Sequence, residues 1–253
     1  MGNSVSYFLL GMKLDSTSYE EATQKIIAWA KGGESRTVCA ASAHMVMEAH
    51  DSSSVLAAVN GTDMVVSDGM PLVWWLRAKG VKNQPRVYGP ELMLHICQSA
   101  ARERIPIGLY GSTQEVVTAL TERLLVKFPG LKINFVKSPP FRSMSAEEDD
   151  IDTQQIVDSG LKILFVGLGC PKQELWIAEH KGRVQAVMFA VGAAFQFHAG
   201  LVTQAPHWMQ NIGLEWLFRT IQEPRRLWKR YIVVVPRFAS LVLLEALGLI
   251  HSR

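Results

Sequence analysis

Short apolar runs alternate with amphipathic stretches along almost the whole chain. The apolar runs show no polar alternation, as in Ile163 to Val166, and glycine or polar residues bound them. Runs of this kind are typical of parallel strands that are covered on both faces. We therefore expect strands at residues 5–10, 36–41, 64–67, 105–110, 131–136, 163–166 and 186–194.

Helical periodicity fills most of the intervals between these runs. Ser18 with Glu21, and Ser145 with Glu148, have the spacing of a capping box, in which the two side chains bond free N–H groups at a helix start. We expect further helices at 43–59 with a break near 51–54, at 71–78, at 91–104, and from 113 to 128. Strands that alternate with helices predict a Rossmann-like α/β domain, with a largely parallel sheet and helices on both faces. Ligands of such sheets bind beyond the carboxyl ends of the strands.

The stretch 161–180 shows this arrangement most clearly. A buried strand ends at Gly167 and Gly169, and Pro171 marks the start of a helix whose first turn holds Lys172 and Gln173. Free N–H groups and the helix dipole favour anions at such a start, so this turn can bind a diphosphate or sugar hydroxyls. The alternative is a solvated first turn. A third glycine at dinucleotide-fingerprint spacing is missing, which counts against a nicotinamide enzyme.

Two charged residues are candidates for chemistry. Asp68 follows an apolar strand, is followed by Gly69, and precedes a helix, so it is our candidate general base. Its alternative role is a plain helix N-cap. Arg86 lies in a loop and can pair with a phosphate, although an ordinary surface arginine explains it equally well.

Metal binding is not favoured by the residue spacing. Asp150-x-Asp152 matches the DxD pattern of metal-dependent sugar transferases, but it lies in a polar helix, so we expect a solvated acidic face. His44 and His198 both follow strands and could face the pocket, and neither has a second ligand at metal spacing. We therefore expect no metal and no other cofactor.

Residues 205–253, which we call the appendage, differ in character from residues 1–204. Tryptophans and tyrosine alternate there with arginines and lysines, and we expect Pro224 and Pro236 to divide the segment into short helices. Charged residues interrupt its apolar end, which argues against a membrane span. Basic, aromatic-rich helices typically lie at the surface of an anionic membrane. The alternative is a helical hairpin that packs on the core or on a second subunit.

The net charge and the cysteines argue against several other classes of protein. A net charge of +3 gives no argument for nucleic acid as a partner. The three cysteines form no CxxC pair, which fits a reducing cytosol, and the N-terminus has no pattern of a signal peptide.

Several motifs, taken together and in order, resemble the WecG/TagA/CpsF family of bacterial glycosyltransferases, also called glycosyltransferase family 26. The resemblance extends from about Leu9 to Tyr231. The motifs are AHMVMEA at 43–49, SDGMPLVW at 67–74, RVYGPEL at 86–92, GLYGS at 108–112, GLGCPKQELW at 167–176, VGAAF at 191–195 and APHWMQNIGLEWLFRTIQEPRRLWKRY at 205–231.

The resemblance implies an inverting transfer of a hexose from a UDP-sugar to a polyprenyl-diphosphate-linked sugar. The hexose would be N-acetylmannosamine, its uronic acid, or a sugar of the glucose type. The enzyme would act without a metal at the inner face of the bacterial membrane, in cell-surface polysaccharide synthesis. It places the base on Asp68. Because charge develops on the leaving phosphate, cationic groups must stabilise it. The candidate substrate-binding residues are Ser42, Gly69, Arg86, Gly111, Gly167, Gly169, Lys172, Gln173, Arg219 and Arg226.

The chain also departs from the family pattern. Ala40 and Ser42 stand where many members have Thr-x-Asn, and Gln196 stands where an aspartate is frequent. A serine hydroxyl offers fewer hydrogen bonds than an amide, so we expect the contact with the sugar donor to be weaker or to be made differently. These changes keep a non-catalytic membrane adaptor open as an alternative, beside the nicotinamide-dependent oxidoreductase. A homo-oligomer is compatible with the sequence.

Overall fold

The computed structural model describes residues 5–250, without the side chains of Arg226, Lys229 and Arg230. Its centre is a six-stranded sheet in which all neighbouring strands are parallel. In order across the sheet, the strands are β4 (Met64–Ser67), β3 (Arg36–Ala41), β8 (Val187–Ala190), β7 (Ile163–Gly167), β5 (Ile107–Gly111) and β6 (Ile133–Lys137). The expected parallel α/β architecture is confirmed.

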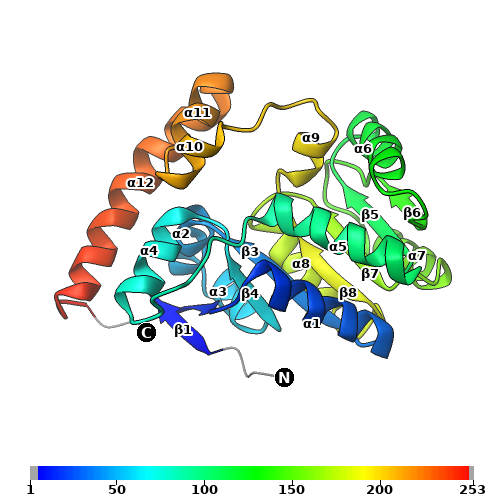
Figure 1. The fold of residues 1–253 in the computed structure, drawn as a ribbon, viewed down its shortest axis with the longest axis horizontal. Helices are drawn as coiled ribbons and strands as arrows, with labels where there is room; N and C mark the ends of the chain where they lie inside the picture. Colours follow the sequence, from blue (N-terminus) through cyan, green and yellow to red (C-terminus); the bar gives the residue numbers. More distant parts are fainter. Residues whose placement is uncertain (1–4, 251–253) are drawn as a thin grey trace.

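Helices cover both faces of the sheet (Figure 1). One face packs against α1 (Tyr19–Gly32), α5 (Gly89–Glu103), α6 (Gln114–Lys127) and α9 (Ala194–His198). The other face packs against α2 (Ala43–Asp51), α3 (Ser53–Asn60), α4 (Met70–Ala78), α7 (Ala146–Asp158) and α8 (Lys172–His180). Both expected capping boxes are present, at Ser18 with Glu21 and at Ser145 with Glu148.

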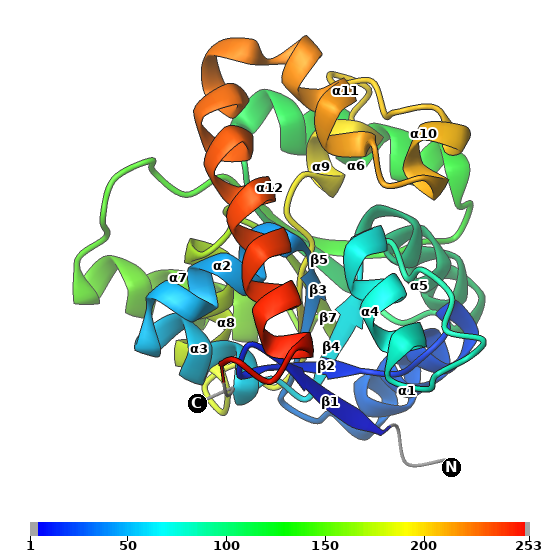
Figure 2. The ribbon, with the colours of Figure 1, turned by 90° about the vertical axis from the view of Figure 1, so that its left-hand side faces the viewer.

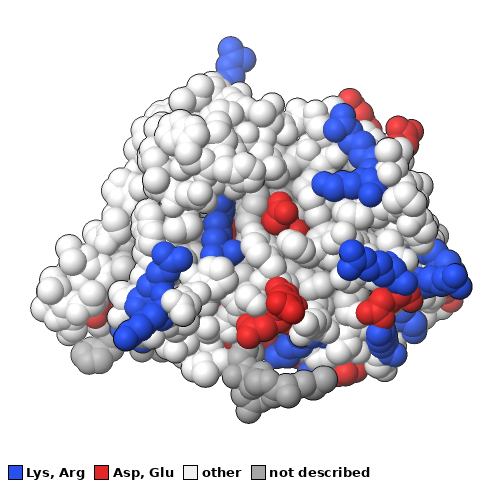
Figure 3. Space-filling view, viewed as in Figure 1, with Lys and Arg blue, Asp and Glu red and all other residues white. Residues whose placement is uncertain are grey.

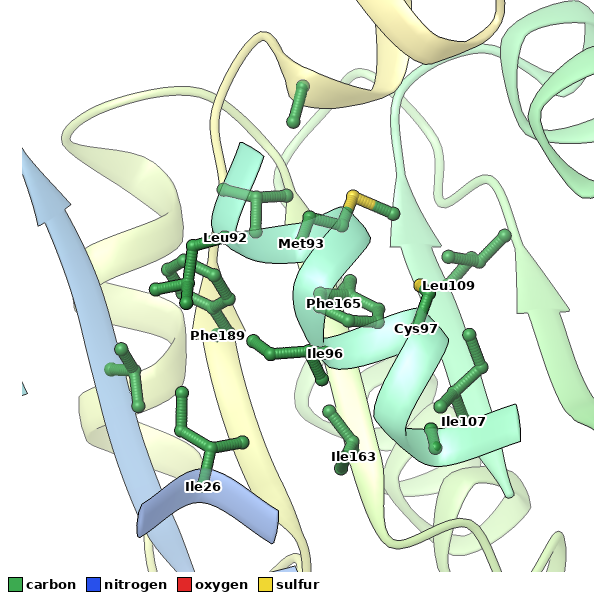
Figure 4. Packing of buried hydrophobic residues seen from close by; sticks show 14 of the residues in the cluster. Ile26, Leu92, Met93, Ile96, Cys97, Ile107, Leu109, Ile163, Phe165 and Phe189 are labelled. Carbon is green, nitrogen blue, oxygen red and sulfur yellow. The ribbon is translucent and has the colours of Figure 1, made fainter. Parts of the chain in front are cut away.

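Alternate residues of the central strands enter opposite cores, which explains the uninterrupted apolar runs. In β7, Ile163 and Phe165 belong to one core, and Leu164 and Val166 belong to the other. Figure 4 shows the first of these cores, where Phe165 lies under α5. Burial on both faces holds the sheet rigid, so the residues at its carboxyl edge have fixed positions.

The N-terminal segment forms an antiparallel hairpin of β1 (Ser6–Leu9) and β2 (Met12–Asp15) instead of the single expected strand. Leu10 and Gly11 make the two-residue turn, with φ values of 50° and 83°. Turns with two positive φ angles match the twist of paired strands, and glycine adopts them readily. The hairpin packs beside β4 and α3 at the edge of the domain.

The appendage forms α10 (His207–Asn211), α11 (Glu215–Gln222) and α12 (Pro224–Ala246). Pro224 begins α12 as expected, whereas the expected break at Pro236 is wrong, because α12 continues through it. Pro236 is exposed, so the carbonyl that loses its backbone partner there can be hydrated. Figure 2 shows α12 running along the molecule beside α2. Within residues 5–250, no helix combines the length and apolar character needed to cross a bilayer.

Polar contacts join the far end of α12 to the body. Both Nη atoms of Arg237 lie 2.5 Å from the Asp51 carboxylate, and Glu245 accepts a 3.0 Å bond from the backbone N–H of Leu10. Phe238 is buried between them in the core that contains α2. The C-terminal half of α12 therefore packs on the domain.

Candidate active site

The carboxyl ends of the parallel strands open into a cleft of about 1180 Å³. Residues that follow β3, β4, β7 and β8 form its floor, and residues of α10, α11 and α12 cover it. Figure 3 shows basic atoms set back in a hollow below the region of α10 and α11, whose own surface is almost uncharged in this view. The appendage therefore supplies one wall of the cleft.

Asp68 lies on the floor of this cleft, directly after β4. Its Oδ1 accepts a 2.7 Å hydrogen bond from the backbone N–H of Gly89, the first residue of α5. The N-cap of the adjacent helix α4 is Gly69, so Asp68 is not a plain cap of that helix. A Cβ at Gly89 would lie 2.8 Å from that of Ala40, so glycine is needed for this close approach. Two segments far apart in the sequence thus fix the carboxylate.

The environment raises the pKa of Asp68 to about 6. Burial in the cleft is the largest cause, and the negative charge of Glu215 adds to it. The charge of Arg86 and the hydrogen bond from Gly89 act in the opposite direction. A carboxylate with this pKa is largely ionised at pH 7 and still a better base than an ordinary aspartate, which suits it to accept a proton.

Arg86 binds the appendage. Its Nε donates to the backbone carbonyl of Asp68, its Nη1 lies 3.2 Å from Gln210 Oε1, and its Nη2 lies 2.6 Å from Glu215 Oε2. The guanidinium also lies over the ring of Tyr88, whose hydroxyl donates a 2.8 Å bond to Glu215 Oε1. Glu215 therefore bridges Arg86 and Tyr88, and this arginine links α10 and α11 to the strand that carries Asp68.

Arg219 of α11 also lines the cleft. Its guanidinium lies 5.5 Å from the ring centroid of Phe197, and its Nε is buried without a hydrogen-bond partner. Its positive charge favours the ionised form of Asp68, so it acts within the same site. A buried N–H donor without a partner is costly and is available to a ligand oxygen. Arg226, the other predicted arginine, has its side chain outside the described residues.

Gln173 holds two loops together from inside. Its Oε1 accepts 3.1 Å bonds from the backbone N–H groups of Gly169 and Gly192, and its Nε2 donates a 2.8 Å bond to Glu174 Oε1. Its exposed fraction is 3%, so the side chain points into the protein below the cleft surface. Glu174 is fully buried, and burial raises its pKa to about 7. This pair fixes the turns that follow β7 and β8.

The remaining predicted binding residues divide into two groups. Ser42, Gly69, Gly167, Gly169 and Lys172 all line the cleft, as do the departures from the family pattern at Ala40 and Gln196. Gly111 does not line it. A Cβ there would lie 2.5 Å from the backbone of Gly167, so Gly111 permits the close approach of β5 and β7.

The acidic and histidine candidates agree with the sequence expectation only in part, at Asp150 and His44. Asp150 pairs with Arg183, but Asp152 is buried and binds Tyr110 and Lys137, so the second acid is not on a solvated face. His44 lines the cleft, with Nδ1 buried and unpartnered. His198 lies outside this cleft and its Nε2 is 2.8 Å from the carbonyl of Pro90. Among residues 5–250, no group of three such side chains is arranged to hold a metal ion.

Residues 7–251 match the model of the glycosyl transferase WecG/TagA/CpsF family. The chain belongs to this family. It is also 27% identical over 188 residues to the N-acetylglucosaminyldiphosphoundecaprenol N-acetyl-beta-D-mannosaminyltransferase of Bacillus subtilis (strain 168). That alignment covers 74% of this chain and 71% of the relative. The protein is accordingly a glycosyltransferase.

Sequence reasoning did not identify Gly89, Gln210, Glu215 or Glu174 as parts of this site. Glu215 stands in a quoted family motif, GLEWLFR, yet its partner Arg86 is 129 residues away in the chain. No periodicity connects positions so far apart. The signal that could have found it is that Glu215 is one of only three acids among the basic and aromatic residues of the appendage.

Proposed function

We propose that this glycosyltransferase moves a hexose from a UDP-sugar to a polyprenyl-diphosphate-linked sugar with inversion of configuration. The observation that carries the proposal is the position of Asp68, whose carboxylate is fixed on the floor of the cleft and has a raised pKa. An inverting transfer by single displacement needs one such base near the acceptor hydroxyl. The family match and the name of the Bacillus subtilis relative support the same reaction type.

In this mechanism, Asp68 takes the proton of the acceptor hydroxyl as its oxygen forms a bond to the anomeric carbon. The bond from the anomeric carbon to the donor phosphate breaks at the same time, and UDP leaves with the electron pair. The negative charge that develops on UDP needs cationic or N–H donors. Arg219, with its unpartnered Nε, and Lys172 at the start of α8 line the cleft and supply such groups. We expect Arg219 and Lys172 to stabilise the leaving UDP without a divalent metal.

The outer face of α12 supports contact with a membrane, where a polyprenyl-linked acceptor resides. Trp228, Ile232 and Val233 are exposed there, and basic residues stand between them in the sequence. Such a face binds an anionic bilayer through apolar burial and charge attraction. We propose that the enzyme works at the inner face of the cytoplasmic membrane.

Vesicle co-sedimentation with phosphatidylglycerol tests this contact. Ile232→Glu should weaken sedimentation with the vesicles, whereas Glu115→Gln, on the exposed start of α6, should not. Equal sedimentation of Ile232→Glu and the wild type would mean that α12 only covers the cleft.

Release of UDP is the experiment that tests the reaction. Donors would be UDP-N-acetylmannosamine, UDP-N-acetylglucosamine and UDP-glucose, each with an N-acetylglucosaminyl diphosphate on a short prenyl chain and with EDTA present. We expect acceptor-dependent release from one donor. Folded protein that releases UDP from none of them would contradict the proposal and favour a non-catalytic adaptor. Release that requires added Mg²⁺ would contradict the metal-independent mechanism alone.

A further inference from the structure

The cleft is large enough to hold more than one small ligand. Its volume is about 1180 Å³, whereas a pocket for one small ligand usually measures about 300–1,000 Å³. The polar groups already described, Asp68, Arg86 and Arg219, gather at one end, under α10 and α11. The space at the other end is bounded by different residues.

That second end, which we call the apolar arm, lies between α12 and the body of the domain. Tyr231, Val234, Val235 and Phe238 line it from α12, and this spacing of three or four residues places them on one helix face. Met45 of α2 and Leu175 of α8 line it from the opposite side. The cleft is continuous, so the apolar arm adjoins the end that holds Asp68 and Arg86, while Arg142, Asp149 and Glu179 also line the cleft.

The mouth of the apolar arm offers apolar contacts beside polar ones. Residues 139–145 line the cleft, with Pro139, Pro140 and Phe141 next to Arg142, and Phe141 is 80% exposed. In Figure 2 this segment forms the green loop that extends away from α12. The outer face of α12 carries the exposed Ile232 and Val233 described above. A hydrocarbon chain that leaves the arm between these elements would stay in contact with apolar surface.

We propose that the apolar arm binds the first isoprene units of the acceptor's polyprenyl chain, next to its diphosphate. This inference rests on the proposed function and adds a lipid subsite to it. The acceptor has a polar sugar diphosphate joined to an apolar chain, and the cleft has a charged end that adjoins an apolar end. The Bacillus subtilis relative is named for an acceptor of this chemistry, a sugar diphosphate on undecaprenol.

Acceptors of different chain length test the subsite. N-acetylglucosaminyl diphosphate would be attached to an ethyl, a geranyl or a tetraprenyl group and assayed by UDP release, without vesicles and below the aggregation threshold. Burial of apolar carbon should raise kcat/KM by roughly tenfold for each of the first isoprene units, mainly through KM. Equal kcat/KM for the ethyl and tetraprenyl acceptors would overturn the proposal and leave the proposed function intact.

A valine in the arm and an exposed valine of α6 provide a matched pair of variants. Val234→Trp should fill the arm and reduce the tetraprenyl-to-ethyl ratio of kcat/KM by at least tenfold, and Leu175→Trp should do the same from the opposite wall. Val126→Trp places the same ring on α6, outside the cleft, where Val126 is 83% exposed, and should keep the wild-type ratio. A Val234→Trp ratio equal to that of Val126→Trp, in folded protein, would overturn the proposal.

Calorimetry with geranylgeranyl diphosphate separates this inference from the proposed function. If no acceptor is turned over, the proposed function fails, but the arm should still bind geranylgeranyl diphosphate more tightly in the wild type than in Val234→Trp. If the wild type and Val234→Trp bind geranylgeranyl diphosphate equally, or if neither binds it, the lipid subsite is overturned whatever the outcome for the proposed function.

Discussion

Substitution of Glu215 by glutamine should strengthen the acidity of Asp68. Glutamine keeps the shape of the side chain: its amide oxygen can still accept from Arg86, and its amide NH₂ can donate to the Tyr88 hydroxyl. The change removes the negative charge that raises the pKa of Asp68. Arg86 then has one carboxylate fewer near it, so its charge acts more strongly on Asp68. The change therefore tests whether the appendage tunes the base or only covers it.

The size of the effect follows from Coulomb's law. Two unit charges about 7 Å apart interact by roughly 2 kcal/mol at an effective dielectric constant of about 20, and water in the cleft reduces this further. One pKa unit corresponds to about 1.4 kcal/mol, so we expect the pKa of Asp68 to fall by about one unit, from about 6 towards 5. A weaker base also accepts protons less readily, so the plateau rate should fall moderately.

The assay is the pH dependence of kcat/KM for UDP release between pH 4.5 and 8.5. In the wild type, activity should rise through the pKa of about 6 as Asp68 ionises, and Glu215→Gln should move this limb to lower pH. Glu115→Gln, the same chemical change on the exposed start of α6, should leave the limb in place. A uniform loss of activity with an unmoved limb would refute the tuning of Asp68 by Glu215.

Two further predictions concern the supports of the site. Gly89→Ala should lower the free energy of unfolding by about 1–3 kcal/mol, because its Cβ would lie 2.8 Å from that of Ala40. The added change Ala40→Gly removes that obstacle, so chemical denaturation should show partial recovery; no recovery would contradict the steric explanation. Glu174 has a pKa raised to about 7 from 4.5, so its contribution to stability is full below pH 4.5 and declines as pH rises towards 7, by up to roughly 3 kcal/mol. Glu174→Gln cannot ionise and should flatten this decline in thermal unfolding; parallel pH curves for both proteins would contradict it.

The sheet was predictable because its strands and helices carry local signals. The run from Ile163 to Val166 and the capping boxes at Ser18 and Ser145 are local signals of this kind, and all lie where expected. The β1–β2 hairpin was missed because Leu10 is apolar and continues the strand pattern through the turn. Pro236 was misjudged because the sequence does not reveal that its helix face is exposed.

The candidate site was predictable only in part. Asp68 and the turn after Gly167 follow strands, and the carboxyl ends of parallel strands meet at one edge, so their position could be expected. The partners that determine the behaviour of Asp68 come from Gly89 and Glu215, at distant positions. The contacts of Arg86 to α10 and α11 likewise depend on how the appendage packs, which no local pattern specifies.

The most direct test of the account is the rate of UDP release by Asp68→Asn. Asparagine has nearly the same shape and cannot take a proton, so we expect kcat to fall by about 10²–10⁴-fold while thermal unfolding stays close to the wild type. Asp158→Asn, on the exposed end of α7, makes the same chemical change outside the cleft and should retain full activity. Near-normal turnover by folded Asp68→Asn would contradict the central claim that Asp68 is the base.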